Sequence, residues 1–384
     1  MFLIINKSYA MHDSGNRLIS LDFFRGATVA AMIMVNDPGS WTYKYDQLSH
    51  AKWEGCTFTD LIFPFFLFIV GISITLSFGK ALKKGTSRSQ LVIRTLKRSA
   101  IIFLLGFFLG LFPEFDFTQF RILGVLQRIA LVFLACAMIY LFISKKSQFI
   151  LYGTILVGYY LLLTYVPVPG IGPANLDPVN NFSAWFDRLI LDGFLGTKGL
   201  DRYDSTGLFS TIPAVASGMS GLFAGYLLDQ KSMDEKVRLI WLFIAGSAMM
   251  LLGWIFSFEF PMIKRIWNSS YVLYTSGIAL ICIASAYWFL DVLKYRKMTA
   301  PFVAFGVNAL IAYFLAGIWG KLSNTIIVAT VGGNDIPIKQ WVYEEILLSF
   351  FDRYNASLAY AIINTSVMFI PIWIMYKKGI VIKV

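Results

Sequence analysis

Long apolar segments recur along the whole chain, with short polar segments between them. Ten of these segments have a length close to that of a membrane-spanning α-helix, which needs about 20 residues to cross a bilayer core. Their approximate bounds are 18–36, 58–79, 98–113, 121–143, 148–167, 207–228, 237–257, 270–291, 300–320 and 357–376. This pattern predicts an all-α, polytopic integral membrane protein with about 10 transmembrane helices in a single domain, 1–384. The long loop 168–206 near the middle leaves open a division into two five-helix halves.

The first predicted helix carries a polar stripe. Asp22, Arg25 and Asn36 interrupt an otherwise apolar segment. Arg25 and Asn36 fall within about 20° of each other around an α-helix, and Asp22 falls about 40° from Asn36. Polar residues at membrane depth face a cavity or other helices rather than lipid. The stripe therefore predicts a cavity or a partner helix beside this helix.

The loop between the first two predicted helices holds His50, one of only two histidines in the chain. Histidine transfers protons near neutral pH, although a lone loop histidine more often has no such role. Asn36 ends the first helix and Asp60 opens the second, so both should lie at the same membrane face as His50. Thr57 and Asp60 also have the spacing of a helix capping box. Asp60 is therefore expected to cap the helix, to orient His50, or to do both.

The composition supports a membrane protein and excludes other classes. Of the 384 residues, 57% are hydrophobic and only 14% are charged. The net charge of +11 would suit nucleic acid, but cytoplasmic loops of membrane proteins collect Lys and Arg, so we expect no nucleic-acid partner. Cys56, Cys136 and Cys282 are far apart and lack metal-binding spacing, so we expect no metal. The opening MFLII is too short for a signal-peptide core.

The loop charges predict the orientation in the membrane. Of the 33 Lys and Arg residues, 20 fall in tails and short loops on one side, and 11 fall in longer loops on the other. The positive-inside rule then places both termini, including the tail 1–17, in the cytoplasm. It places His50 and the loops 168–206 and 321–356 outside. We therefore expect a multi-pass protein of the inner, cytoplasmic membrane.

Two groups of basic residues are candidate anion contacts. Arg94, Lys97 and Arg98 follow the most basic predicted cytoplasmic loop, where a topology signal is the simpler interpretation. Arg128 follows Gln127 within the fourth predicted helix. Snorkelling to the interface and a place in a polar cavity wall are both open for Arg128.

The outer loops hold candidate sugar contacts. The loop 168–206 is too long for a simple connection, and it combines Asp177, Asp204 and several amides with aromatic residues. That composition suits sugar binding, but it is also typical of ordinary solvated turns. Trp53, in the His50 loop, and Asn308, in the ninth predicted helix, are further candidates. An interhelical hydrogen bond is the simpler role for Asn308.

Several stretches resemble, in order, the heparan-α-glucosaminide N-acetyltransferase family. The most specific is HAKWEGCTFTDLIFPFFLFIVG, and others are RLISLDFFRG, RILGVLQRIAL, YDSTGLFSTIPAVASG and PFVAFGVNAL. The resemblance implies a multi-helix membrane acyltransferase that uses cytosolic acetyl-CoA to acetylate a glucosamine amine across the membrane. It also implies that His50 matches the family's active-site histidine and Asn36 a functional asparagine.

We therefore predict an acetyl-CoA-dependent N-acetyltransferase for a small-molecule or glycan acceptor with a free amine. His50 is expected to be the general base or acyl carrier, assisted by Asn36 and Asp60. The donor contacts are expected at Arg25, Arg94, Lys97, Arg98 and Arg128, and the acceptor contacts at Trp53, Asp177, Asp204 and Asn308. An amino-sugar transporter or permease and a scaffold protein are the alternatives. Whether the protein forms a homo-oligomer is left open.

Overall fold

A computed structural model describes residues 3–6, 18–117, 121–191, 194–195, 203–230, 232–331 and 334–383. Apart from 3–6, the predicted tail 1–17 lies outside the described residues. The chain is almost entirely helical, as predicted. Its long helices are α1 (Ile19–Asn36), α2 (Phe58–Lys83), α3 (Arg88–Leu111), α4 (Val125–Phe142), α5 (Lys145–Tyr165), α7 (Thr211–Asp229), α8 (Glu235–Phe256), α9 (Ser269–Tyr287) and α13 (Arg353–Lys377).

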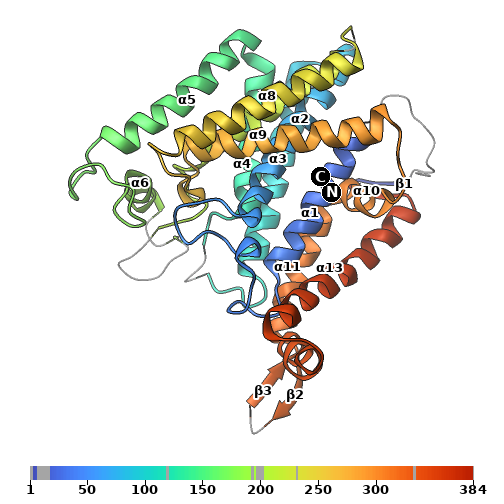
Figure 1. Ribbon diagram of the computed structural model, residues 1–384. Coiled ribbons are helices and arrows are strands. Elements are labelled where there is room, and N and C mark those ends of the chain that lie inside the picture. The colour runs from blue at the N-terminus through green and yellow to red at the C-terminus, as the bar shows by residue number, and fades with distance from the viewer. Residues whose placement is uncertain are drawn as a thin grey trace.

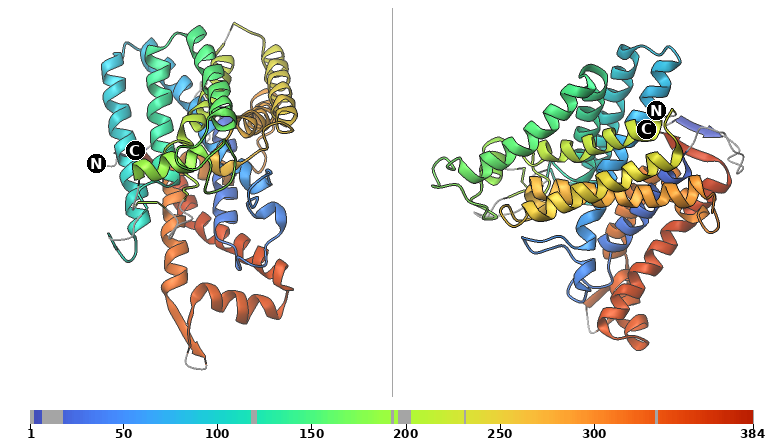
Figure 2. Two further views of the ribbon diagram at one scale, coloured as in Figure 1. Left: turned by 90° about the vertical axis from the view of Figure 1, so that its left-hand side faces the viewer. Right: turned by 45° about the horizontal axis from the view of Figure 1, so that its top comes forward.

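Shorter elements connect and extend these helices. They are α6 (Phe182–Leu191), α10 (Ala300–Val307), α11 (Ala309–Thr325), α12 (Ile338–Trp341) and the single turns η1 (Asp46–Leu48) and η2 (Lys264–Ile266). Four strands form two antiparallel pairs, β1 (Leu3–Asn6) with β4 (Ile380–Lys383) and β2 (Ile327–Val331) with β3 (Asn334–Pro337). The first pair joins the two ends of the described chain, and the second extends beyond the helices as a hairpin (Figures 1 and 2).

The membrane-spanning character is confirmed, while the count of ten helices stays a prediction. Eight described helices are long and apolar enough to cross a membrane, and α10 with α11 would add a ninth. Helix α3 is outside this set, since basic residues occupy its first half. The predicted span 300–320 is bent: α10 and α11 meet at an angle of 86° at Asn308, whose backbone leaves the helical conformation.

Helix packing depends on close backbone approach at glycines. Helices α2 and α7 cross where a Cβ atom built on Gly71 would lie 2.0 Å from the Gly218 carbonyl oxygen. A Cβ atom on Gly221 would lie 1.9 Å from the Phe68 carbonyl oxygen. Lipid-embedded helices associate through such small residues, because the hydrophobic effect does not drive one apolar helix against another. This crossing fixes α2, the helix whose first turn contains Asp60.

We predict that Gly221→Ala destabilises the fold. The added methyl group must displace the α2 backbone, and overpacking of this kind costs about 1–3 kcal/mol. Thermal unfolding of the purified protein in detergent measures the effect. Gly153→Ala in α5 is the matched control, because no neighbouring side chain or segment comes within 4 Å of the place that its added methyl group would take. Equal melting temperatures for the two variants would contradict the packing argument.

Candidate active site

The Asp60 carboxylate organises the start of α2. Its Oδ2 accepts hydrogen bonds from the Thr57 amide (3.1 Å), the Thr57 hydroxyl (3.0 Å) and the Ala51 amide (3.0 Å). The Thr57 hydroxyl also donates to the Ser49 carbonyl at 2.7 Å. The predicted capping box is confirmed, and Asp60 closes the loop on either side of His50 as well as the helix end.

His50 lies against the other oxygen of the same carboxylate. Its Nδ1 is 2.7 Å from Asp60 Oδ1, and its side chain is 48% exposed while that of Asp60 is 1% exposed. An ionised carboxylate can only accept hydrogen bonds, so Nδ1 carries the proton in this contact. The Nε2 atom is then the basic nitrogen of the ring. The expectation that Asp60 orients His50 agrees with this geometry.

Lys264 completes this cluster from a distant part of the sequence. Its Nζ is 3.2 Å from Asp60 Oδ1 and 2.9 Å from His50 Nδ1. The turn η2 carries Lys264 to the site, and the Gly55 amide anchors the His50 loop to that segment by donating to the Met262 carbonyl (2.8 Å). Burial lowers the pKa of Lys264, and the charge of Asp60 opposes that shift.

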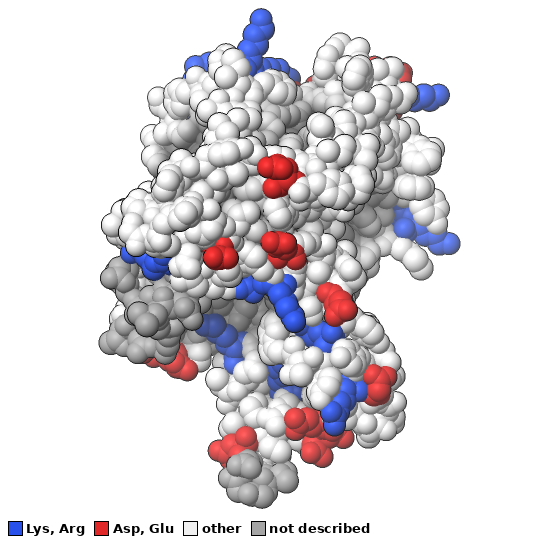
Figure 3. Space-filling model, turned by 60° about the vertical axis from the view of Figure 1, so that its left-hand side comes forward, with Lys and Arg blue, Asp and Glu red and all other residues white. Residues whose placement is uncertain are grey.

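A cavity of about 320 Å³ opens in front of this cluster, and we call it the outer cavity because the loop charges predict that this side is extracytoplasmic. Its polar lining residues are Asn36, His50, Thr59, Asp60, Arg121, Tyr203, Ser205, Thr206, Lys264 and Arg265. The Asn36 side chain at the end of α1 is exposed and faces this space together with His50. Lys and Arg side chains gather around a hollow between the helical body and the part that carries β2 and β3 (Figure 3). The cavity therefore offers a base, an amide and several cations to one ligand.

Buried partners fix the cations of the cavity wall. Asp204 accepts hydrogen bonds from Arg121 Nε at 2.9 Å and from the Thr206 amide at 2.7 Å. Asp204, which was predicted to contact the acceptor sugar, therefore supports Arg121. Arg265 lies over the Tyr203 ring, 5.5 Å from its centroid, and donates to its hydroxyl. Trp53 packs edge-on against the same ring at 6.0 Å.

The other predicted contacts lie in different places. Asp177 is exposed, and the wall of the outer cavity does not include it. Arg128 is buried at the start of α4, where it donates to the Gly207 carbonyl at 3.1 Å and lies over the Trp267 ring. This position is near the outer cavity, whereas Arg94 and Lys97 are exposed on α3. Their roles at the donor stay predictions.

A second, inner cavity of about 320 Å³ lies at the opposite end of α1 and α2. Arg25 lines it and bonds to Ser73 Oγ (2.9 Å) and the Gly306 carbonyl (3.2 Å), so this residue of the polar stripe faces a cavity, while Asn36 faces the outer one. Arg98 also lines it, 4.9 Å from the Phe133 ring centroid. Two of the predicted donor contacts therefore meet at one inner site.

Asn308 belongs to this inner cavity rather than to the outer one. Its side chain donates to the Ile380 carbonyl (3.0 Å) and accepts from the Ile382 amide (3.1 Å). These two bonds tie β4 to the break between α10 and α11. Asn308 thus lies beside the part of α2 that lines the inner cavity, away from His50 at the start of α2. Its side-chain amide already forms hydrogen bonds within the protein.

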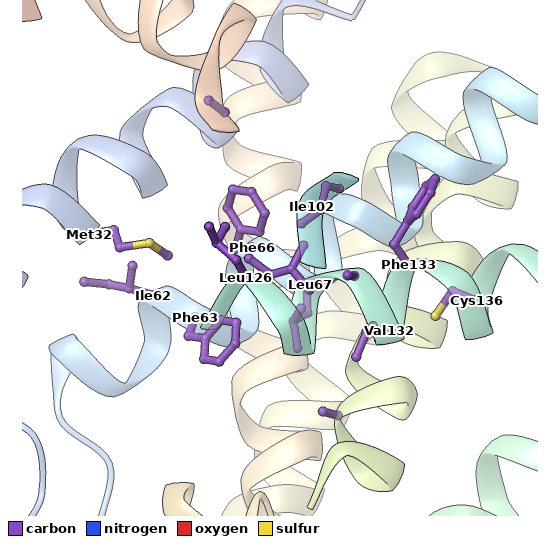
Figure 4. Packing of buried hydrophobic residues seen from close by; sticks show 14 of the residues in the cluster. Met32, Ile62, Phe63, Phe66, Leu67, Ile102, Leu126, Val132, Phe133 and Cys136 are labelled. Atoms are coloured by element: carbon purple, nitrogen blue, oxygen red, sulfur yellow. The ribbon is translucent and has the colours of Figure 1, made fainter. Parts of the chain in front are cut away.

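An apolar barrier separates the two cavities. Met32, Ile62 and Phe63 line the outer cavity, and Phe66 and Ile102 line the inner one. Leu126 and Leu67 fill the region between these side chains, and all seven are buried (Figure 4). The two polar ends of the α1–α2 pair are therefore not joined in this conformation.

Sequence reasoning missed Lys264, Arg265 and Arg121 as site residues. All three are among the 11 basic residues that the loop charges assign to the outer side. Their presence on the side that carries fewer basic residues was the available signal. The partners that hold them come from other segments of the chain, and the spacing of residues does not show such contacts.

The fold and the site define a polytopic membrane protein with a histidine–carboxylate pair in a cavity at one membrane face. The model of a family described as heparan-alpha-glucosaminide N-acetyltransferase, catalytic, matches residues 17–195, which include Asn36, His50 and Asp60. The chain is similar to this family over that segment.

Two relatives extend the comparison. The chain is 28% identical over 353 residues to the heparan-alpha-glucosaminide N-acetyltransferase of Mus musculus, with 78% of this chain and 53% of the relative covered. It is 28% identical over 351 residues to that of Homo sapiens, with 77% and 52% covered. The chain thus spans about half the length of these relatives.

We predict that Cys56, although it lies beside Asp60, is not the acyl carrier. Burial raises the pKa of its thiol to about 12, so almost no nucleophilic thiolate exists near neutral pH. Iodoacetamide at pH 8 should alkylate Cys56 at least about 100-fold more slowly in the folded protein than in the unfolded chain. Mass spectrometry of the Cys56 peptide measures the rate, and Cys56→Ala should keep its activity. Rapid alkylation of the folded protein would contradict this assignment.

Proposed function

We propose that the protein is a membrane N-acetyltransferase that moves an acetyl group from acetyl-CoA to the amine of a glucosamine-type sugar. The observation that carries the proposal is the exposed His50 ring, held by Asp60 through Nδ1, with Nε2 as its basic nitrogen beside a cavity that Asn36 also lines. The similarity to the N-acetyltransferase family supports the same reaction class.

The site has the groups that acetyl transfer requires. The acceptor amine forms a C–N bond to the thioester carbonyl carbon, the C–S bond breaks, and the amine proton passes to His50 Nε2. That proton can then neutralise the departing thiolate. In the covalent route, Nε2 itself attacks the carbonyl carbon and the C–S bond breaks to release the thiolate. The amine then attacks the same carbon, the C–N bond to histidine breaks, and the amine proton passes to the freed Nε2 and on to the thiolate. The Asn36 amide would donate to the developing oxyanion in both routes.

The donor would enter from the cytoplasmic face through the inner cavity. Arg25 and Arg98 line that cavity and offer positive charge to its phosphates. Arg25 and Asn36 are separated by about 16 Å along the helix axis, a depth that an extended pantetheine arm could bridge. The barrier at Phe63 and Phe66 would have to open for the thioester to reach His50.

The acceptor would bind in the outer cavity, where Arg121 and Arg265 have fixed positions. One observation favours the transporter alternative, namely the break between α10 and α11 beside the inner cavity. Broken helices in transporters usually occur as a pair that holds the substrate near the midplane. The described residues contain one such bent pair instead of two, and the Asn308 side chain at the break is already hydrogen-bonded to β4. We therefore favour the transferase.

The sidedness of the site gives a direct prediction. Asp46→Cys in the exposed His50 loop, made in a Cys56→Ala background, should react with an impermeant thiol reagent added to intact cells. The loop charges require this result, because the loop that holds Asp46 lies on the side with fewer basic residues. Lys84→Cys in the exposed α2–α3 connection is the control and should react only after the membrane is permeabilised. The opposite pattern would reverse the assigned orientation.

The second prediction concerns chemistry. His50→Ala should lower acetyl transfer to amino sugars by about 10²–10⁴-fold, because the proton acceptor or acyl carrier is lost. Asn36→Ala should lower turnover by about 10²–10³-fold with a smaller effect on the Michaelis constant for the donor. The assay uses purified protein, labelled acetyl-CoA and a panel of amino sugars, with uptake into vesicles measured in parallel.

The control for this assay is His12→Ala, which removes the chain's other histidine. Folding and donor binding should be close to normal in every variant, since both mutated site residues are exposed. Near-normal turnover in a well-folded His50→Ala protein would refute the mechanism. An acetylated His50 peptide after incubation with donor alone would select the covalent route.

A further inference from the structure

Lys264 is a cation whose side chain is only 19% exposed and that the proposed reaction does not itself use. Its Nζ is within 3.2 Å of Asp60 Oδ1 and 2.9 Å of His50 Nδ1, although 214 positions in the sequence separate it from His50. A buried ammonium group loses its hydration and needs a compensating charge. Asp60 supplies that charge, and the same carboxylate oxygen also faces His50.

The three groups cannot all form hydrogen bonds in every protonation state. If Lys264 donates to Nδ1, that nitrogen is unprotonated and its lone pair points at a carboxylate oxygen 2.7 Å away, which is repulsive. If Nδ1 instead donates to Asp60, then Lys264 also donates to Asp60, and the carboxylate accepts from both groups, while the 2.9 Å approach of Nζ to Nδ1 is then no hydrogen bond. The second arrangement satisfies the carboxylate, and in a neutral ring it leaves Nε2 unprotonated.

The net charge of the cluster decides the state of the imidazole. A carboxylate alone beside a histidine favours the imidazolium ion, which has no free lone pair for accepting a proton. Lys264 neutralises the carboxylate, so a second positive charge on the ring gains little. We propose that Lys264 is a positioning residue that keeps His50 in the neutral Nδ1–H form, with Nε2 available to the acceptor or the acetyl group.

The other titratable groups near the cluster do not offer another way to control the protonation state of His50. The other charged or titratable side chains near the cluster are Cys56, Arg121, Arg128, Tyr203, Arg265 and Tyr271. Cys56 stays a neutral thiol because burial raises its pKa to about 12. Tyr271 uses its hydroxyl to donate to the Asp60 carbonyl, and Arg121 is paired with Asp204. Among these neighbours, Lys264 is the cation that contacts the His50–Asp60 pair.

The test uses the fact that the chain has only two histidines. In a His12→Gln background, ¹⁵N-labelled histidine gives ring signals from His50 alone, and these signals report both its tautomer and its protonation. The expected result at pH 8 is a protonated Nδ1 and an unprotonated Nε2. In Lys264→Met, the midpoint of the titration should move to higher pH by about one unit or more.

Two variants make the comparison specific. Lys264→Arg retains the charge and should keep a midpoint close to that of the parent protein. Lys52→Met removes a positive charge from the exposed part of the same loop and should leave the titration unchanged. If acetyl transfer is confirmed, the acid limb of the kcat/KM profile of Lys264→Met should move in the same direction, so activity lost at low pH returns at higher pH.

The role of Lys264 and the proposed function can fail independently. Only the predicted effect of Lys264 on catalysis rests on the proposed function. A protonated Nε2 in the parent protein, or an unchanged midpoint in folded Lys264→Met, would overturn the role of Lys264 whether or not the protein transfers acetyl groups. If Lys264→Met does not fold, the tautomer of the parent protein and the Lys264→Arg titration decide. Absence of any transferase activity would remove the proposed function but leave the spectroscopic result standing.

Discussion

The outer site depends on one buried charge, the carboxylate of Asp60. It is 1% exposed, and a buried carboxylate is tolerated only when hydrogen bonds and opposite charge compensate its lost hydration. The N-terminus of α2, the Ala51 and Thr57 amides and Lys264 provide that compensation. Because these partners come from three segments, satisfying one carboxylate also fixes the His50 loop, the start of α2 and the turn η2 relative to one another.

The same two helices connect this charge to the opposite membrane face. Helix α2 begins at the outer cavity and passes the inner cavity, while the stripe on α1 reaches from Asn36 to Arg25. Between them lie apolar side chains that water or ions would not cross readily. A donor with a long, narrow arm and a charged head is suited to such a path, because the head can stay at one face while the acetyl group reaches the other.

The sequence predicted those features that local pattern determines. Long apolar segments identified the long helices, and the spacing of Thr57 and Asp60 predicted the cap that is observed. The sequence could not predict the bend at Asn308, because that residue is held by β4, more than 70 positions away. It also could not bring Lys264 to His50 or show that Asp204 supports Arg121. These arrangements are long-range pairings of single polar groups, which leave no periodic signal.

Three outer basic residues follow a common rule. Arg121 pairs with Asp204, Lys264 with Asp60, and Lys339 with Asp37 at 2.6 Å. Each of the three carboxylates belongs to a residue that is less than 9% exposed, and each pair joins segments more than 80 positions apart. The positive-inside rule disfavours basic residues in outer loops, so those that occur there need a local reason. A buried carboxylate is such a reason for Arg121 and Lys264 at the outer cavity, and for Lys339 in a separate cavity beside Asp37.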